Sequence, residues 1–163
     1  MTAPAELTTP NELTYFTVTG TWRDVEAADP AGTTNTPQFL EISGFVTFTA
    51  RLAPGTVIYV TNLDQGSGTG ANTAVALAPV TARIMAGQLQ TIDRANTPNI
   101  QLVANTTLLG LSSLIYDVLF TDITYAGATQ QLANFAFTAP TSSGTLNLTD
   151  PTLMRLPYNP TGY

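Results

Sequence analysis

Apolar and polar residues alternate with a period of two along much of the chain, and this alternation predicts β-strands. The clearest run covers residues 13–22, where Phe16 and Val18 share one face and Thr17 and Thr19 share the other. Side chains at alternate positions of a strand point to opposite faces of its sheet. The run is therefore expected to form a strand with one face in the core.

Similar runs recur along the chain and are separated by turn residues. The run at 114–125 is the best candidate for a central strand, and Gly87 stands where a tight turn would close a hairpin. Residues 106–115 alone have helical spacing, enough for one or two turns. The remaining predicted strands are 39–50, which has apolar residues on both faces, and 56–62, 73–78, 80–85, 89–92, 100–104, 131–138 and 144–148.

About nine or ten short strands with no crossover helices predict an all-β fold, an antiparallel β-sandwich of Ig-like or jelly-roll-like type. The strands occupy one domain at residues 14–150. An N-terminal arm at 1–13 and a proline-rich C-terminal arm at 151–163 lie outside the strand pattern. Residues 23–38 combine acids with prolines and glycine, so we expect an exposed connection and candidate contact loop.

The C-terminal arm is the main candidate binding segment. It carries Leu153, Leu156, Tyr158 and Tyr163 between prolines that favour an extended backbone. Apolar side chains on such a segment are stabilised only when another surface covers them. That surface is either the arm's own domain or a neighbouring subunit, and we predict that these four residues contact a partner in an oligomer.

Composition removes most catalytic and metal-binding chemistry. The 163 residues are 10% charged, carry a net charge of −6, and include no Cys, no His and no Lys. Thiolate or imidazole metal sites, Ser-His and Cys-His pairs, and Schiff-base catalysis therefore cannot form. Five scattered arginines make no basic patch for nucleic acid. We expect a protein that is not an enzyme and needs no metal or cofactor.

The remaining candidates for chemistry are carboxylates, and each has a simpler structural interpretation. Asp117 and Asp122 are five residues apart on one strand, which places them on opposite faces and roughly 16 Å apart. They cannot form the acid pair of a glycosidase, and Asp117 is expected at an edge or bonded to an arginine. The segment 64–72, Gly- and Ser-rich, matches a calcium loop weakly and is expected to be a flexible loop.

Three further features point to no site. Trp22 could stack on a sugar, but it shares a face with Phe16 and is expected in the core. The sequons at Asn105 and Asn147 are expected by chance in a chain rich in Asn and Thr. No apolar run is long enough for a membrane helix, and residues 1–11 do not have the pattern of a secretory signal peptide, so synthesis without export is expected.

Several strand motifs follow one another in a fixed order: residues 15–20 (YFTVTG), 42–49 (ISGFVTFT), 79–84 (PVTARI), 116–120 (YDVLF), 135–137 (FAF) and 144–150 (GTLNLTD). In this order they resemble the small β-domain of minor tail proteins, virion structural proteins of long-tailed phages of actinobacteria. The resemblance covers residues 13–153 and leaves out both arms. The segments 33–38 and 64–72 are longer than in that pattern.

The resemblance implies a structural role in a bacteriophage virion, with assembly through the β-domain and the arms. The implied partners are other phage structural proteins and further copies of the chain in a homo-oligomer. Two alternatives stay open: a capsid decoration protein on the phage head, and a carbohydrate- or receptor-binding module that contacts a glycan of the host envelope. The resemblance carries no catalytic residue.

Overall fold

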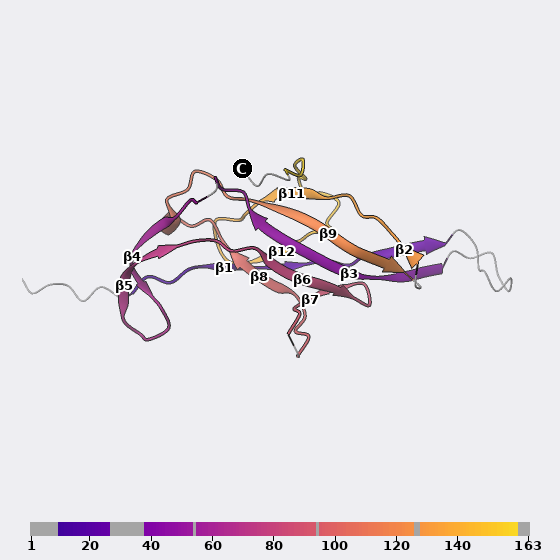
Figure 1. The fold of residues 1–163 in the computed structure, drawn as a ribbon, viewed down its shortest axis with the longest axis horizontal. Helices are drawn as coiled ribbons and strands as arrows, with labels where there is room; N and C mark the ends of the chain where they lie inside the picture. The colour runs from indigo at the N-terminus through magenta and orange to yellow at the C-terminus, as the bar shows by residue number, and fades with distance from the viewer. Residues whose placement is uncertain (1–9, 27–37, 54, 94, 126–127, 160–163) are drawn as a thin grey trace, which may run out of the picture.

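The computed structural model describes residues 10–26, 38–53, 55–93, 95–125 and 128–159. This part of the chain contains twelve strands and one short 3-10 helix, η1 (Thr107–Leu109). The predicted all-β, sandwich-like fold is confirmed (Figure 1). Helical spacing at 106–115 yields the single turn η1, which ends at Gly110 in a left-handed conformation.

Seven strands form the larger sheet, in which β3 and β9 run side by side in its interior. β6 and then β7 extend the sheet beyond one side of β3, while β10 and β11 pair with β9. β2 pairs with the first residues of β3. The seven strands are β2 (Arg23–Glu26), β3 (Gln38–Ala50), β6 (Val80–Met85), β7 (Gln88–Gln90), β9 (Ile115–Tyr125), β10 (Ala128–Thr129) and β11 (Phe135–Thr138).

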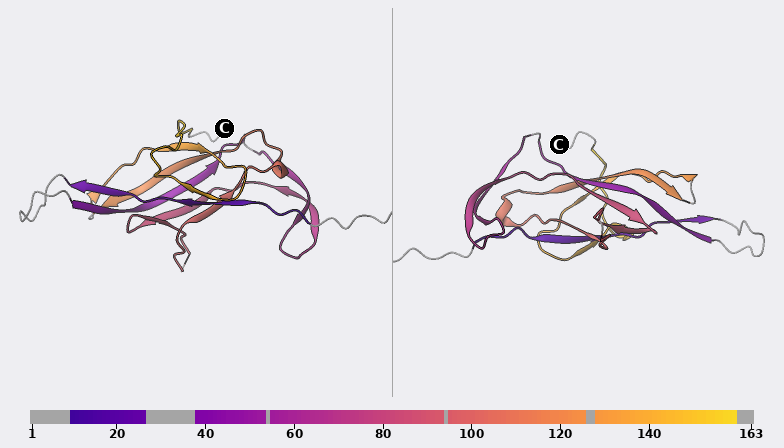
Figure 2. Two further views of the ribbon diagram at one scale, coloured as in Figure 1. Left: turned by 180° about the vertical axis from the view of Figure 1, so that it is seen from behind. Right: turned by 60° about the horizontal axis from the view of Figure 1, so that its bottom comes forward.

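A smaller sheet and a separate two-stranded ribbon complete the fold. In the smaller sheet β1 lies between an antiparallel neighbour, β8, and a parallel one, β12. The ribbon of β4 and β5 lies at one end of the elongated molecule, and β2 with the start of β3 lies at the other (Figures 1 and 2). These strands are β1 (Tyr15–Thr19), β8 (Ile100–Val103), β12 (Thr145–Asn147), β4 (Ile58–Asp64) and β5 (Gly70–Val75).

An aromatic cluster joins the two sheets at the centre of the core. The ring of Phe137 on β11 lies 6.2 Å from Phe16 of the smaller sheet, 6.4 Å from Phe48 and 5.8 Å from Tyr116. All four side chains are buried. Aromatic residues bury the largest apolar areas, so this cluster supplies much of the hydrophobic stabilisation between the sheets. The Tyr116 hydroxyl also donates to the Val103 carbonyl at 2.8 Å, which ties β9 to β8.

Strand β3 has one buried face and one face that is largely open. Ile42, Val46 and Phe48 are buried in the core, as the alternation predicts. Phe45 on the opposite face is 40% exposed, although that face also looks apolar in sequence. Solvent therefore reaches the middle of the outer face of the larger sheet.

One turn and one bulge depend on unusual backbone conformations. Ala86 and Gly87, with φ of 52° and 78°, form the predicted tight turn between β6 and β7. The β3–β9 register shifts between Ser43 and Phe45, opposite Asp122, whose φ is 53°. A Cβ on Gly44 would collide with Ile123 at this bulge. Glycine at 44 lets the two long strands stay paired through the irregularity.

The predicted exposed connection at 23–38 is wrong at both ends, because Arg23–Glu26 is strand β2 and Gln38 begins β3. Arg23 pairs with Glu41 and Val25 with Phe39, so backbone pairing forms a ribbon that composition alone reads as a loop. Residues 27–37 lie outside the described residues. The predicted loop at 64–72 is shorter than expected, since β5 already begins at Gly70.

Substitution Tyr116→Phe tests how the sheets are joined. Loss of the hydroxyl leaves the half-buried Val103 carbonyl without this donor, so we expect the free energy of unfolding to fall by about 1 kcal/mol at neutral pH. Urea denaturation followed by tryptophan fluorescence measures the change. Tyr59→Phe, at an exposed tyrosine on β4, is the matched control and should change nothing.

The same variant has a signature at alkaline pH. Burial raises the pKa of Tyr116 from 10.0 to about 12, so above pH 10 the unfolded chain loses this proton before the folded one does. The unfolded state then binds fewer protons, and wild-type stability falls between pH 10 and about pH 12. Tyr116→Phe should show a shallower fall over this window. An identical slope in both proteins would contradict the assignment.

Candidate functional site

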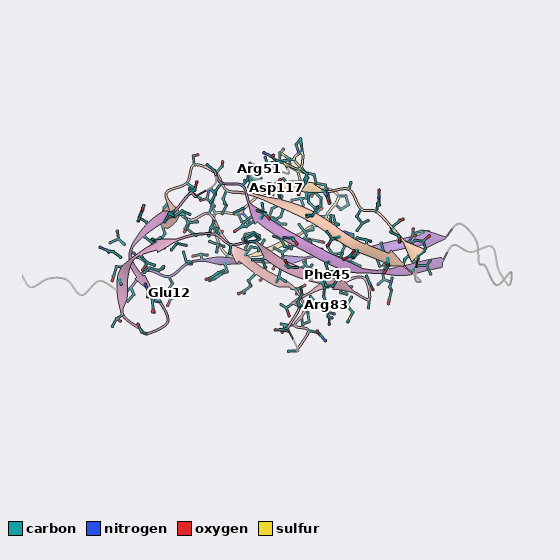
Figure 3. All side chains as sticks on the ribbon, in the orientation of Figure 1. Glu12, Phe45, Arg51, Arg83 and Asp117 are labelled. Carbon is teal, nitrogen blue, oxygen red and sulfur yellow. The ribbon has the colours of Figure 1, made fainter. Side chains whose placement is uncertain are left out.

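The most distinctive polar feature is a buried carboxylate, Asp117, on the outer face of β9. Asp117 is 2% exposed and forms an ion pair with Arg51. Arg51 Nη2 lies 2.6 Å from Asp117 Oδ1, and Arg51 Nε lies 3.1 Å from Asp117 Oδ2. The Asn159 N–H donates to the same Oδ1 at 3.0 Å. Figure 3 shows Arg51 and Asp117 together beside the C-terminal segment. Of the two settings expected for Asp117, the bond to an arginine is confirmed, and exposure at an edge is wrong because the residue is buried.

The geometry of this ion pair indicates a structural role. A two-point contact between guanidinium and carboxylate occupies both carboxylate oxygens, and the Asn159 N–H adds a third donor. The hydrogen bond to Asp117 raises the pKa of Arg51 above its ordinary value, so the cation is permanent. Arg51 Nη2 also donates to the Pro157 carbonyl at 2.9 Å. A carboxylate held in this way is an anchor for the chain.

The described part of the C-terminal arm, residues 151–159, lies on its own domain. Leu156 and Ala136 exchange two backbone hydrogen bonds, of 2.9 and 2.8 Å, so the arm adds an antiparallel bridge beside β11. Arg155 donates to the carbonyl of Leu148 at 2.7 Å, and its guanidinium lies 5.5 Å from the centre of the Phe135 ring. The arm is therefore part of the fold up to Asn159.

The four residues predicted to contact a partner lie in different settings. Leu153 packs partly against the core. Leu156 and Tyr158 are half-buried as the arm crosses the domain. Tyr163 lies outside the described residues. The structure thus places three of the four against their own domain, and a partner could reach only the parts of these side chains that remain exposed.

The carboxylate oxygens in the acidic turns accept hydrogen bonds from groups close by in the chain. Asp64 Oδ1 accepts from the backbone N–H of Gly66 at 2.8 Å and of Gly68 at 3.2 Å. Hydrogen bonds from Thr152 lower the pKa of Asp150, and the bond from the Thr152 N–H has the largest effect. No group of three or more acidic side chains that could hold a metal ion occurs among the described residues. These carboxylates stabilise turns.

An open groove lies beside the smaller sheet, where the β7–β8 loop stands away from the body (Figure 1). It has a volume of about 440 Å³, and its lining includes Thr17, Gln101 and Asp93. The Thr91 hydroxyl and then the N–H of Thr97 hold the pKa of Asp93 below its ordinary value. The groove offers hydroxyl, amide and carboxylate groups for hydrogen bonds and contains no nucleophile with an activating base.

Trp22 and Asn105 behave as structural residues. Trp22 packs edge-on against Phe120 at 5.9 Å and is partly buried against the core, in agreement with its predicted role. Asn105, in the first sequon, is buried, and its amide points to the Leu111 carbonyl at 3.5 Å. A buried side chain is a poor acceptor for a glycan.

Sequence reasoning did not find Arg51 as the partner of Asp117, because 66 residues separate them. It also did not single out the exposed apolar residues Val25, Phe39 and Phe45. The last of these had one detectable signal: an apolar residue on the second face of the 39–50 strand. The amino-acid composition of a strand does not show whether its second face is covered by other residues or open to solvent.

Comparison of the chain with protein-family models, with curated proteins and with solved structures finds no match. Within the described ranges, no helix has the length and apolar character needed to cross a membrane. The proposal for function therefore rests on the structure of this chain alone.

Substitution Asp117→Asn tests the anchor. It leaves the Arg51 guanidinium without its anionic partner, and we expect the free energy of unfolding to fall by about 3 kcal/mol. The arm should also become more susceptible to proteases near residue 159, which limited proteolysis with mass spectrometry would detect. Asp122→Asn, an exposed position on the same strand, should have little effect. Equal stability of the two variants would show that the pair contributes nothing.

Chelation tests the assignment of the acidic turns. Because the Asp64 carboxylate already accepts two backbone N–H groups, we expect EDTA to leave the melting temperature unchanged. Differential scanning fluorimetry with and without added calcium measures this. A calcium-dependent increase that Asp64→Asn abolishes would identify a cation site in the loop.

Proposed function

We propose that the chain is a non-enzymatic structural protein of a bacteriophage virion, a minor tail component that assembles with other particle proteins. One observation carries the proposal: exposed apolar side chains lie on projecting ribbons and an open sheet face. Phe39 near the start of β3 is 66% exposed and Tyr59 on β4 is 81% exposed. The start of β3 and the strand β4 lie at opposite ends of the molecule (Figure 1). Val25 is also exposed and is the direct strand neighbour of Phe39, so these two form a contiguous apolar area of the kind that favours protein contacts.

The placement of charge also supports a role in assembly. Asp117, the one buried acid among the described residues, is paired with Arg51, and the acids of the turns accept nearby N–H or hydroxyl groups. General acid or base catalysis needs a carboxylate whose proton can move to a substrate. The carboxylates described above are held by structural donors, which favours a role in assembly over catalysis.

The apolar arm fits the same role. Leu153, Leu156 and Tyr158 keep partial exposure after docking on their own domain, and Tyr163 follows them in the sequence. We retain the prediction that these four residues contact a partner in the particle, through the surface that docking leaves free. In this proposal the protein is made in the host cytoplasm and is located in the tail of the virion.

A second candidate function is glycan or receptor binding at the host envelope. The groove beside the smaller sheet favours it, because Thr17 and Gln101 offer hydrogen bonds and Tyr15 on the same sheet is an exposed aromatic ring. Sugars are bound by this combination of polar groups and aromatic surface. Binding of the isolated protein to host cell-wall fragments, lost in Gln101→Ala and Tyr15→Ala, would establish this function.

Particles of the phage whose genome encodes the chain test the main proposal. We expect quantitative mass spectrometry of purified virions to find the chain at a constant copy number, and immunogold labelling to place it on the tail. Labelling of the head would instead support the capsid decoration alternative. Absence of the chain from intact, infectious particles would overturn the virion proposal.

A further inference from the structure

The peptide bond between Asp150 and Pro151 joins the domain to the C-terminal arm. The sequence contains two Asp–Pro bonds, this one and Asp29–Pro30, which lies outside the described residues. Proline contributes no N–H to its peptide bond. The common side reaction of aspartate, in which the backbone nitrogen of the next residue loses its proton and attacks the side chain, is therefore closed to Asp150. Attack by the side chain on the backbone remains open to it.

The carboxyl group of Asp150 is folded back over this peptide bond. Its Oδ1 accepts a hydrogen bond from the Thr152 N–H at 2.9 Å and another from the Thr152 hydroxyl at 2.8 Å. The first of these closes an Asx turn, a ring of atoms that includes the Asp150–Pro151 bond itself. Within the part of the chain that the structure describes, Oδ2 accepts no hydrogen bond. One carboxylate oxygen is thus held, and the other is available to react.

The carbonyl oxygen of the same bond accepts two further hydrogen bonds. The Leu153 N–H donates to it at 3.1 Å, and Arg155 Nη2 donates to it at 3.1 Å. Both donors draw electron density away from the carbonyl carbon, which makes that carbon easier to attack. The guanidinium also stabilises the negative charge that develops on the oxygen during an attack.

Contacts with other groups hold Arg155 in this position. Its Nη2 also donates to the Leu148 carbonyl at 2.7 Å, and its Nη1 donates to the Leu153 carbonyl at 3.1 Å. The guanidinium lies 5.5 Å from the centre of the Phe135 ring. The positive charge is therefore in place before any reaction begins, and a preorganised donor of this kind lowers a reaction barrier more than a mobile one.

We propose that Asp150 cleaves the peptide bond that follows it, so that the C-terminal arm becomes a separate peptide. Oδ2 attacks the Asp150 carbonyl carbon and forms a cyclic anhydride. The C–N bond breaks, its electron pair goes to the Pro151 nitrogen, and that nitrogen takes a proton from water. Water then hydrolyses the anhydride to two carboxylates on Asp150, and the released proton is taken up by the proline amine. The net reaction consumes one water molecule and breaks one C–N bond.

The surroundings of the bond suit each of these steps. Pro151 is exposed and Asp150 is half-buried, so water can reach both the leaving nitrogen and the anhydride. The hydrogen bonds from Thr152, and then the charge of Arg155, lower the pKa of Asp150. The carboxylate therefore stays in its ionised, nucleophilic form in mildly acidic solution, where protons for the leaving nitrogen are more plentiful.

The arm has contacts that do not depend on the cleaved bond. The backbone bridge between Leu156 and Ala136 and the hydrogen bond from the Asn159 N–H to Asp117 both lie beyond it. The cleaved protein is therefore expected to consist of residues 1–150 and 151–163, which stay together until the fold is lost. The reaction occurs once in each chain and turns over no substrate. It goes beyond the assembly role proposed above and does not depend on it.

Intact-mass spectrometry of the purified full-length protein tests the reaction. The folded protein, held at about pH 5, should yield fragments 1–150 and 151–163. In urea the turn and the Arg155 contacts are lost, so the Asp150–Pro151 and Asp29–Pro30 bonds report the rate of the bond chemistry alone. We expect the Asp150–Pro151 bond to be cleaved about tenfold faster or more in the folded protein than in urea. A rate in the folded protein that is no higher than in urea would overturn the proposal, and this comparison needs no variant.

Two variants test the assigned roles. Arg155→Gln keeps a hydrogen-bond donor but removes the positive charge, and we expect cleavage of the folded protein to slow about tenfold, with the rate in urea unchanged. Asp150→Asn replaces the carboxylate by a weaker nucleophile and should slow cleavage by about as much or more. Cleavage at the wild-type rate in either variant would overturn the mechanism.

Matched substitutions serve as controls. Arg23→Gln removes the charge of an exposed arginine on β2 and should leave the rates in the folded protein and in urea unchanged. Arg155→Lys keeps the positive charge and should cleave faster than Arg155→Gln. Thermal unfolding of every variant shows whether the fold is intact, and the wild-type comparison with urea decides the proposal if a variant at 155 does not fold.

Discussion

The buried carboxylate of Asp117 is the constraint on which the arrangement of the outer face and the C-terminal arm depends. A charge removed from water is stable only when it is paired and fully hydrogen-bonded. Here the pairing needs Arg51, which directly follows β3, and the Asn159 N–H from the arm. The arm must therefore return to β9 after its bridge with β11, and residues that look like a free apolar tail in sequence become part of the domain.

The same anchor divides the outer face into two regions. Near Asp117 the arm covers the sheet, and a threonine on β3, Thr49, is the direct strand neighbour of the carboxylate. Farther along β3 nothing described covers Phe45, and the surface there combines apolar side chains, threonines and isolated charges. A protein that folded only for its own stability would place polar residues on this solvated face. This exposed apolar content is the basis of the assembly role proposed above.

Much of the fold could be predicted from the sequence, because alternation is a local property. The strands around Phe16, Phe48 and Val118 lie where the period of two predicts them, with the expected faces buried. Three features depended on distant partners and could not be predicted. β2 forms because residues 38–41 pair with it, Arg51 neutralises Asp117 across 66 residues, and the arm's position follows from that pair. Of the candidate site, the sequence indicated the apolar residues of the arm and an arginine as a possible partner of Asp117, but not which arginine.

The chain is only 10% charged, and the acids described above hold turns and the C-terminal arm in place. The pKa values of Asp93 and Asp150 lie below their ordinary values because Thr91 and Thr152 donate to them, so these acids stay ionised to lower pH than free carboxylates and stabilise their turns there. A catalytic acid requires the opposite shift, toward neutral pH. The described carboxylates that respond to their surroundings are thus tuned for rigidity. Rigid turns hold the strands of both sheets in register, so a contact made by either sheet would cost little conformational entropy.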